Sequence, residues 1–215
     1  MRPKRIILIR HGESEGNADG EIYSSTPDFR LKLTSKGKEQ AKEAGKELKN
    51  IFGDESLYVY VSPYTRTRQT FKHIRPSIEE NIVRVVEDPR IREQDWGHLQ
   101  SKKYFDEIIK IRDAFSTFYY RIPDGESGAD VYDRVSIFFD TLHRDFENPD
   151  YPQNVLIVTH GMTLRLFLMR WFHWSVEEFE LVRNPKNCQI VVMELQPDGH
   201  YKLIDNLRRR EKLSE

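Results

Sequence analysis

The stretch Ile6-Ile7-Leu8-Ile9, followed by Arg10-His11-Gly12-Glu13, decides how the rest of the chain is organised. Four consecutive apolar residues, three of them β-branched and without helical spacing, predict a buried strand. A cation and an imidazole follow at the end of this strand. In open α/β sheets, ligands bind beyond the carboxyl ends of the strands, so Arg10 and His11 are candidates for a functional site.

Two further stretches repeat this arrangement. Residues 57–61 form an apolar run that ends in Ser62-Pro63-Tyr64-Thr65-Arg66, and residues 155–159 form another that ends in His160-Gly161. If the three strands lie side by side in parallel, their ends bring His11, Arg66 and His160 together. Two histidines and two arginines in one small volume repel each other unless an anion lies between them, and arginine matches phosphate oxygens bidentately. The pattern therefore predicts a phosphoryl-binding site.

The other apolar patterns predict helices and strands in alternation. Helical spacing after Thr34 indicates a helix that Thr34 caps and Gly53 closes. Ser62-Pro63 has the form of an N-cap followed by proline, which predicts a helix start, and Ser127-x-x-Asp130 has the form of a capping box. We also expect helices over 102–121 and 164–171, strands over 83–87 and 190–195, a loop over 13–29 and an exposed or frayed charged tail over 207–215.

Length and composition limit the possible functions. The 215 residues fit one large domain, 1–215, and the formal net charge of −1 gives no overall field to attract nucleic acid. We find no signal peptide and no apolar stretch near the ~20 residues that span a bilayer, so no membrane partner is expected. The single cysteine, Cys188, excludes an internal disulfide and fits a reducing compartment, the cytoplasm or nucleus. The oligomeric state is left open.

Six motifs, in order from residue 10 to residue 161, give the chain a resemblance to the histidine phosphatase superfamily in its phosphoglycerate-mutase-like branch. They are Arg10-His11-Gly12-Glu13-Ser14 with Asn17, Leu33-Thr34-x-x-Gly37-x-x-Gln40-Ala41, Ser62-Pro63-x-x-Arg66, Arg92-Glu93-x-x-Trp96-Gly97, Pro123-x-Gly125-Glu126-Ser127 and Val158-Thr159-His160-Gly161. The resemblance implies an α/β three-layer sandwich with a mostly parallel central sheet flanked by helices. It also implies that residues 98–121 cover the site.

His11 is the candidate nucleophile. Neutral imidazole attacks phosphorus, and an unperturbed pKa near ~6.5 leaves much of it neutral at cellular pH. The resemblance implies that this residue is phosphorylated, giving a phosphohistidine. Arg10, Arg66 and His160 are expected to hold the non-bridging oxygens of the phosphoryl group. Asn17 and the amide of Gly161 are further candidate donors, although Asn17 also suits an ordinary loop turn.

Glu93 is the candidate proton donor, because an alkoxide leaving group needs a proton as its bond to phosphorus breaks. It stands four residues before Gly97, as the acid of the family does. Asp95 is the nearest competitor for this role. Glu126 suits either of two roles, the orientation of an arginine or packing at a helix start.

A catalytic metal site built from His11, His160 and Glu93 is an alternative, because two histidines and a carboxylate are a known ligand set. Two guanidinium groups would repel a divalent cation there, whereas they attract a phosphate. We therefore expect no metal and no cofactor, and a small phosphorylated metabolite as the ligand.

The resemblance favours hydrolysis over mutase activity. Mutases of the family carry a long insertion with paired arginines before the Gly-Glu-Ser motif, whereas here about thirty residues separate the two motifs and Arg112 and Arg121 are isolated. The motifs around Glu93 and Glu126 are similar to those of fungal broad-range acid phosphatases and plant mutase-like relatives, which implies loose specificity for small phosphomonoesters. A phosphoglycerate mutase and a binding domain with little turnover are the alternatives.

Overall fold

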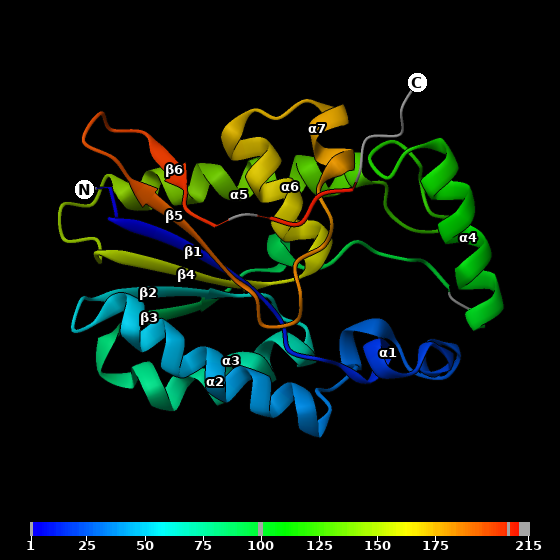
Figure 1. The fold of residues 1–215 in the computed structure, drawn as a ribbon, viewed down its shortest axis with the longest axis horizontal. Coiled ribbons are helices and arrows are strands. Elements are labelled where there is room, and N and C mark those ends of the chain that lie inside the picture. The colour runs from blue at the N-terminus through cyan, green and yellow to red at the C-terminus, as the bar shows by residue number, and fades with distance from the viewer. Residues whose placement is uncertain (1, 99–100, 206, 211–215) are drawn as a thin grey trace.

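A six-stranded sheet forms the centre of the molecule, with helices on both faces (Figure 1). The computed structural model describes residues 2–98, 101–205 and 207–210. The strand order is β3-β2-β4-β1-β5-β6. The four strands from β3 to β1 are parallel, and β5 and β6 each run antiparallel to the preceding strand in this order. The strands are β1 (Arg5–Arg10), β2 (Leu57–Val61), β3 (Ile82–Glu87), β4 (Asn154–Thr159), β5 (Ile190–Leu195) and β6 (Tyr201–Leu203).

The side chains of β1 are buried on both faces of the sheet, which explains why apolar and polar residues do not alternate along this strand. Ile6 and Leu8 pack in a core with α5 (Gly128–Phe146) and α6 (Gly161–Phe172). Ile7 and Ile9 pack in a second core with α2 (Ser35–Phe52) and α3 (Thr65–Ile78). All four side chains are fully buried, and each such burial contributes about 1.5–3 kcal/mol. The predicted three-layer α/β sandwich is confirmed.

The register of the central strands brings their ends together. Arg10 lies opposite Thr159, and Val61 lies opposite Val158. The pairing continues past the strands, because the His11 amide donates to Thr159 O and the Ser62 amide to Val158 O, both at 3.0 Å. The predicted parallel neighbours β1, β4 and β2 are confirmed, and their carboxyl ends form one edge.

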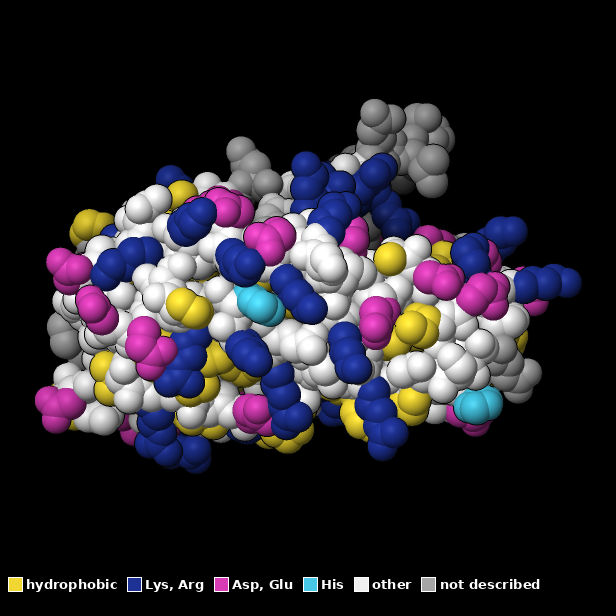
Figure 2. Space-filling view, turned by 90° about the horizontal axis from the view of Figure 1, so that it is seen from below, with side chains coloured by type: hydrophobic (Ala, Val, Ile, Leu, Met, Phe, Trp, Pro, Cys, Tyr) yellow, Lys and Arg dark blue, Asp and Glu magenta, His cyan; other side chains and the backbone are white. Residues whose placement is uncertain are grey.

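The predicted caps of two helices are confirmed. The Thr34 hydroxyl accepts from the Gly37 amide at the start of α2, and Gly53 ends that helix with a φ of 57°. Ser127 and Asp130 form a capping box at the start of α5. Figure 2 shows the molecule from the side of α2 and α3, and acidic and basic side chains are interspersed on that face, as expected for a solvated surface.

The prediction that Ser62 caps a helix is wrong. Helix α3 begins at Thr65 with Tyr64 as its N-cap. The reason is a contact made 98 residues away in the sequence, because the Ser62 hydroxyl lies 2.7 Å from Nε2 of His160. The later start places Arg66 in the first turn of α3.

Two other predictions need correction. The stretch 13–29 is not a plain loop, since it contains α1 (Glu15–Ala18), the 3₁₀ turn η1 (Gly20–Ser24) and the start of η2 (Asp28–Arg30). Helix α4 spans only Lys102–Phe115 of the predicted 102–121, because Glu180 binds the Ser116 hydroxyl and the Phe118 amide and so holds the chain away from a helical path.

The charged tail is predicted to be exposed or frayed. Residues 208–210 are exposed, and Arg209 forms a bridge with Val182, while 211–215 lie outside the described residues.

Helix α4 lies beyond the carboxyl ends of the strands, apart from the sheet (Figure 1). Phe105 stacks against Tyr23 of η1, with ring centroids 6.0 Å apart, and lies 4.6 Å from the ring of Trp96. Two aromatic side chains of the segment predicted as helix, Phe115 and Tyr119, are 71% and 59% exposed. Residues 99–100 of the predicted cover over 98–121 are outside the described part, and the covering role stays a prediction. No helix in the described residues is long and apolar enough to cross a bilayer.

Candidate active site

The strand ends bring His11, Arg66 and His160 into one buried cluster, as predicted. The rings of His11 and His160 lie with centroids 5.2 Å apart at an angle of 62°. The Arg66 Nε donates to Nε2 of His11 at 3.2 Å. The exposed fractions of His11, Arg66 and His160 are 3%, 4% and 0%. Because the three groups are shielded from water, their mutual electrostatic effects are strong.

The hydrogen bonds of His11 define which nitrogen can react. Its Nδ1 lies 2.7 Å from the carbonyl oxygen of Gly12, which can only accept, so Nδ1 carries the proton. The Nε2 lone pair therefore points into the cluster toward Arg66. Burial, then the charges of Arg66 and Arg10, lower the pKa of His11 well below its usual 6.5. The imidazole is thus held neutral, the form in which it is a nucleophile.

His160 and Ser62 form the other side of the cluster. Burial, and then the nearby Arg66 and His11, lower the pKa of His160 well below 6.5. Its Nε2 binds the Ser62 hydroxyl, while its buried Nδ1 has no hydrogen-bond partner among the described residues. Ser62 therefore orients His160.

Arg66 is held by Asp28, which sequence reasoning did not single out. The carboxylate binds Nη1 at 2.8 Å and Nη2 at 3.0 Å, so it occupies the terminal edge of the guanidinium and leaves the Nε–H directed at His11. Burial lowers the pKa of Arg66, but the charge and hydrogen bonds of Asp28 outweigh it and raise the pKa. Asp28 therefore fixes both the charge and the direction of Arg66.

If the site hydrolyses phosphoesters, as the sequence predicts, replacing Asp28 with asparagine should lower kcat/KM roughly 10- to 100-fold, because small misplacements of a catalytic group have effects of this size. Steady-state assays with p-nitrophenyl phosphate measure the effect. Glu87→Gln is the matched control, since Glu87 binds Arg68 on the same helix in an exposed bidentate pair. Equal activity of Asp28→Asn and the control would refute the orienting role.

Arg10 lies within electrostatic reach of the cluster. Its Nη1 donates to Pro185 O at 2.7 Å, and its buried Nε finds no partner in the described part of the chain. Burial is the main reason for its lowered pKa, and Arg66 lowers it further while Glu93 raises it. Arg10 is therefore a cation with an unused donor beside the site.

The Glu93 carboxylate is bound at the N-terminus of α6. Its Oε2 accepts from the Met162 amide, and its Oε1 from the amide and hydroxyl of Thr163, all at 3.2 Å. Free amides and the helix dipole favour a carboxylate there. These hydrogen bonds place the Glu93 carboxylate beside the start of α6, whose N-cap is His160 and whose first residue is Gly161.

The two competing carboxylates have other partners. Asp95 Oδ1 accepts from the Gly97 amide at 2.9 Å. Glu126 forms ion pairs with Arg92 and Arg134 and accepts from the Asp95 amide at 3.0 Å. Of its two predicted roles, the orientation of arginines is the one that these contacts favour.

Asn17 and Gly161 also border the cluster. The Asn17 Oδ1 accepts from Ser14 N at 3.2 Å and from Asn187 Nδ2 at 3.0 Å, and Asn187 also donates to the His11 carbonyl. The backbone amide of Asn17 donates to Ser14 O at 2.9 Å, and its side-chain Nδ2 makes no hydrogen bond among the described residues. At Gly161, a Cβ would come within 2.9 Å of the Asn184 side chain, so a larger residue here would displace Asn184.

Tyr23 is a further site residue that the sequence did not indicate. Burial, followed by the charge of Asp28, raises its pKa to about 12, and its hydroxyl lies within reach of the charges of Arg66, Glu93 and Arg10. With Tyr64 and Trp96 it lines a cavity of about 340 Å³. The aromatic walls suit the organic part of a small phosphoester.

No three His, Cys, Asp or Glu side chains in the described ranges come together as a set that could hold a metal ion. A sequence model of the histidine phosphatase superfamily, branch 1, matches residues 6–206. This chain belongs to the histidine phosphatase superfamily.

Proteins similar to this chain include one named as mutase-like and others named as phosphatases. The chain is 48% identical to the phosphoglycerate mutase-like protein AT74 of Arabidopsis thaliana, over 94% of this chain and 68% of that protein. It is 31% identical to the broad-range acid phosphatase DET1 of Saccharomyces cerevisiae, over 90% and 86% of the two chains. A solved structure of mycobacterial glucosyl-3-phosphoglycerate phosphatase superposes with a TM-score of 0.74 at 20% identity, covering 95% and 99% of the chains, which shows the shared fold.

Proposed function

We propose that this histidine phosphatase hydrolyses small phosphomonoesters through a phosphohistidine at His11. The observation that carries the proposal is the neutral His11 imidazole, whose unprotonated Nε2 faces the Nε–H of Arg66 inside a buried cluster. A yeast relative is named a broad-range acid phosphatase, which supports phosphoester hydrolysis and loose specificity.

The reaction follows from the arrangement of these groups. His11 Nε2 attacks phosphorus, a P–N bond forms, and the P–O bond to the leaving alcohol breaks. Glu93, in its protonated form, gives the departing oxygen a proton. Water then attacks the phosphohistidine, the P–N bond breaks, and the Glu93 carboxylate takes the proton of the water. Arg66, Arg10 and His160 stabilise the oxygens of the transferring group, which is the main task in phosphoryl transfer.

The assay that tests this proposal is hydrolysis of p-nitrophenyl phosphate in the presence of EDTA. We also propose that no metal ion is needed, because the guanidinium groups of Arg10 and Arg66 attract phosphate and repel a divalent cation. Turnover that survives the chelator supports both statements. The hydrolytic function would be contradicted if the protein did not hydrolyse p-nitrophenyl phosphate but converted 3-phosphoglycerate to its 2-isomer with a bisphosphate primer.

Replacing Glu93 with glutamine should have an effect that depends on the leaving group. Alkyl phosphates need a protonated leaving oxygen, so kcat should fall roughly 10²- to 10⁴-fold, whereas p-nitrophenolate leaves without a proton and its release should be much less affected. Burst kinetics on both substrates separate the two steps. Asp95→Asn is the control. If Asp95→Asn shows the leaving-group dependence and Glu93→Gln does not, Asp95 is the proton donor.

The lowered pKa of His11 predicts retained activity in acid. An imidazole with an unperturbed pKa of ~6.5 would lose roughly tenfold of its neutral form between pH 7 and pH 5.5, whereas His11 stays neutral over this range. We expect kcat/KM for p-nitrophenyl phosphate, which reports the pKa of the free enzyme, to stay within about threefold across this range. A tenfold fall per pH unit below about 6.5 would contradict a depressed pKa.

The same pKa shift has the opposite effect on stability. Below about pH 6.5 the unfolded chain binds protons at His11 and His160 that the folded chain does not bind. The free energy of unfolding therefore decreases as the pH is lowered. Thermal unfolding should show a lower Tm at pH 5 than at pH 7, and the His11→Asn variant should lose part of this dependence.

A further inference from the structure

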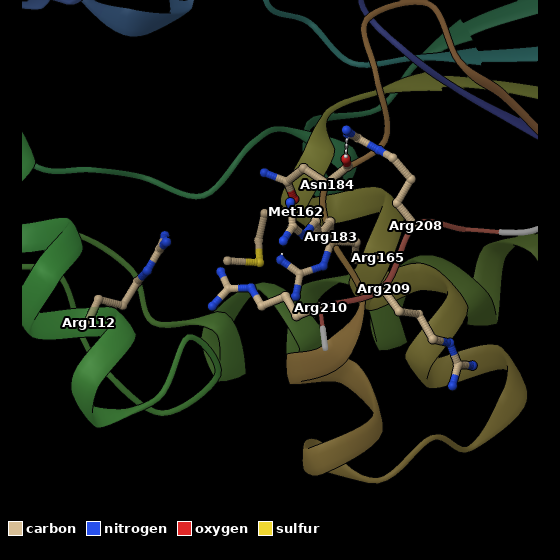
Figure 3. Close-up of a pocket in the computed structure, with 8 residues that line it drawn as sticks. All are labelled: Arg112, Met162, Arg165, Arg183, Asn184, Arg208, Arg209 and Arg210. Atoms are coloured by element: carbon tan, nitrogen blue, oxygen red, sulfur yellow. Dashed lines mark hydrogen bonds between the residues drawn. The ribbon is translucent and has the colours of Figure 1, made fainter. Parts of the chain in front are cut away.

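A second cavity, which we call the arginine cavity, lies beside the N-terminal half of α6. Its volume is about 1070 Å³. Six of its eight lining residues are arginines and none is acidic, as Figure 3 shows: Arg112, Met162, Arg165, Arg183, Asn184, Arg208, Arg209 and Arg210. Arg112 extends from α4 and Arg210 extends toward it from the opposite wall, whereas Arg209 points away from the other arginines (Figure 3). Segments far apart in the sequence therefore bring their positive charges to one cavity.

Few of these positive charges are neutralised within the described residues. Asp113 is shared by Arg112, at 2.8 Å, and by Arg210, at 3.6 Å. The Arg183 and Arg209 side chains make no hydrogen bond or ion pair in the ranges that the structure describes. An excess of guanidinium groups in one cavity is favourable only when anions lie between them.

Arg165 lies deepest in the arginine cavity and is only 4% exposed. It donates to Phe179 O at 2.9 Å and to Asn184 Oδ1 at 3.3 Å, but its buried Nε has no partner among the described residues. Burial lowers its pKa to about 10, with Arg210 and Arg112 adding to the effect and Glu180 opposing it. A buried donor without a partner, held as a cation among other cations, indicates a place for an anionic oxygen.

The arginine cavity shares a wall with the catalytic cluster. The Met162 amide donates to Glu93 Oε2, and Met162 also lines the cavity. Asn184, another lining residue, packs against Gly161. The charges also interact across the wall, because Arg208 is among the groups that lower the pKa of Arg10, after burial. The arginine cavity and the cluster of His11, Arg66 and His160 are therefore neighbouring sites, joined through Met162 and Asn184.

We propose that the arginine cavity holds the additional phosphate groups of a multiply phosphorylated substrate whose reacting phosphoryl group lies at His11. This inference rests on the proposed function of the same site. The charge argues for several phosphates, since in the described part of the chain six guanidinium groups line the cavity, only Asp113 forms ion pairs with them, and Glu180 acts on Arg165 through its charge. The volume agrees, because it is in the range of pockets that bind whole small molecules rather than one ion.

The test compares ligands that differ in the number of phosphates. Binding is measured by calorimetry in the His11→Ala background, where turnover cannot remove the ligand. Tripolyphosphate and myo-inositol hexakisphosphate should each bind at least roughly tenfold more tightly than inorganic phosphate. The Arg183→Gln/Arg210→Gln double variant should lose most of this advantage. The control is Arg84→Gln. Arg84 is exposed on β3, an edge strand of the sheet, and this variant should keep the tighter binding of the polyphosphates.

The ratio of the two polyphosphate affinities distinguishes the sources of the anionic groups: tighter binding of tripolyphosphate indicates a linear oligophosphate, and tighter binding of myo-inositol hexakisphosphate indicates a phosphorylated polyol. With His11 intact, the double variant should hydrolyse p-nitrophenyl phosphate at the wild-type rate, while KM for the preferred polyphosphate rises at least roughly tenfold. Equal affinity for phosphate and both polyphosphates, or unchanged affinity in the double variant, overturns the inference. If wild type fails to hydrolyse p-nitrophenyl phosphate, the proposed function fails, and the calorimetry still decides whether the arginine cavity binds polyphosphates.

Discussion

Replacing His11 with alanine should lower kcat for p-nitrophenyl phosphate by roughly 10⁴-fold or more, since removal of a covalent nucleophile has effects of this order. The physical reason is that the unprotonated Nε2 of His11 is the nitrogen that faces Arg66, whereas Nε2 of His160 is bound to the Ser62 hydroxyl. Steady-state assays at high enzyme concentration measure the residual rate.

The matched control for this variant is His200→Ala. His200 is exposed and precedes β6, at the edge of the sheet, so its loss should leave kcat unchanged. Activity of His11→Ala within tenfold of wild type would show that the phosphoryl group is transferred to another residue or directly to water.

Replacing Arg66 with alanine should lower kcat by roughly 10²- to 10³-fold, as expected when one preorganised donor to the transition state is lost. Arg66→Lys should recover little of it, because lysine cannot bind Asp28 bidentately and still direct a fixed N–H at His11. The measurement is kcat and KM for p-nitrophenyl phosphate in both variants.

Arg68→Ala provides the control on the same helix, since Arg68 is exposed and pairs only with Glu87 among the described residues. It should behave as wild type. If Arg66→Lys were fully active, positive charge alone would suffice, and the geometric role that we assign to Arg66 and Asp28 would be wrong.

The strand ends were predictable because the signals that specify them are local. The four apolar residues of β1 encode a strand buried on both faces, and the residues that follow it must lie at the carboxyl edge of a parallel sheet. The same holds for β2 with Arg66 and for β4 with His160. The cluster of His11, Arg66 and His160 could therefore be placed before its contacts were known.

Residues that act through distant partners could not be predicted in this way. Ser62 carries a strong local capping signal, yet its hydroxyl binds His160 instead, and this contact shifts the start of α3 to Thr65. Asp28 and Tyr23 lie in a polar segment without periodicity, and only the tertiary fold brings them to Arg66.

The same limit applies to element ends and to the arginine cavity. The apolar pattern continues past Phe115, but Glu180 of α7 (Val176–Leu181) binds the chain at Ser116 and ends α4. The net charge of −1 gave no indication of a local excess of positive charge, because arginines from four separate segments converge only in the folded chain.

We propose that the phosphoryl group passes through His11. The most direct measurement is to mix the enzyme with p-nitrophenyl phosphate, quench it in alkali, where phosphohistidine is stable, and locate the phosphate by peptide mass spectrometry. We expect a phosphate on the peptide that contains His11, absent from His11→Ala and increased in Glu93→Gln, which is slow to hydrolyse the intermediate. Phosphate on a different residue, or full turnover with no phosphorylated peptide, would contradict transfer through His11.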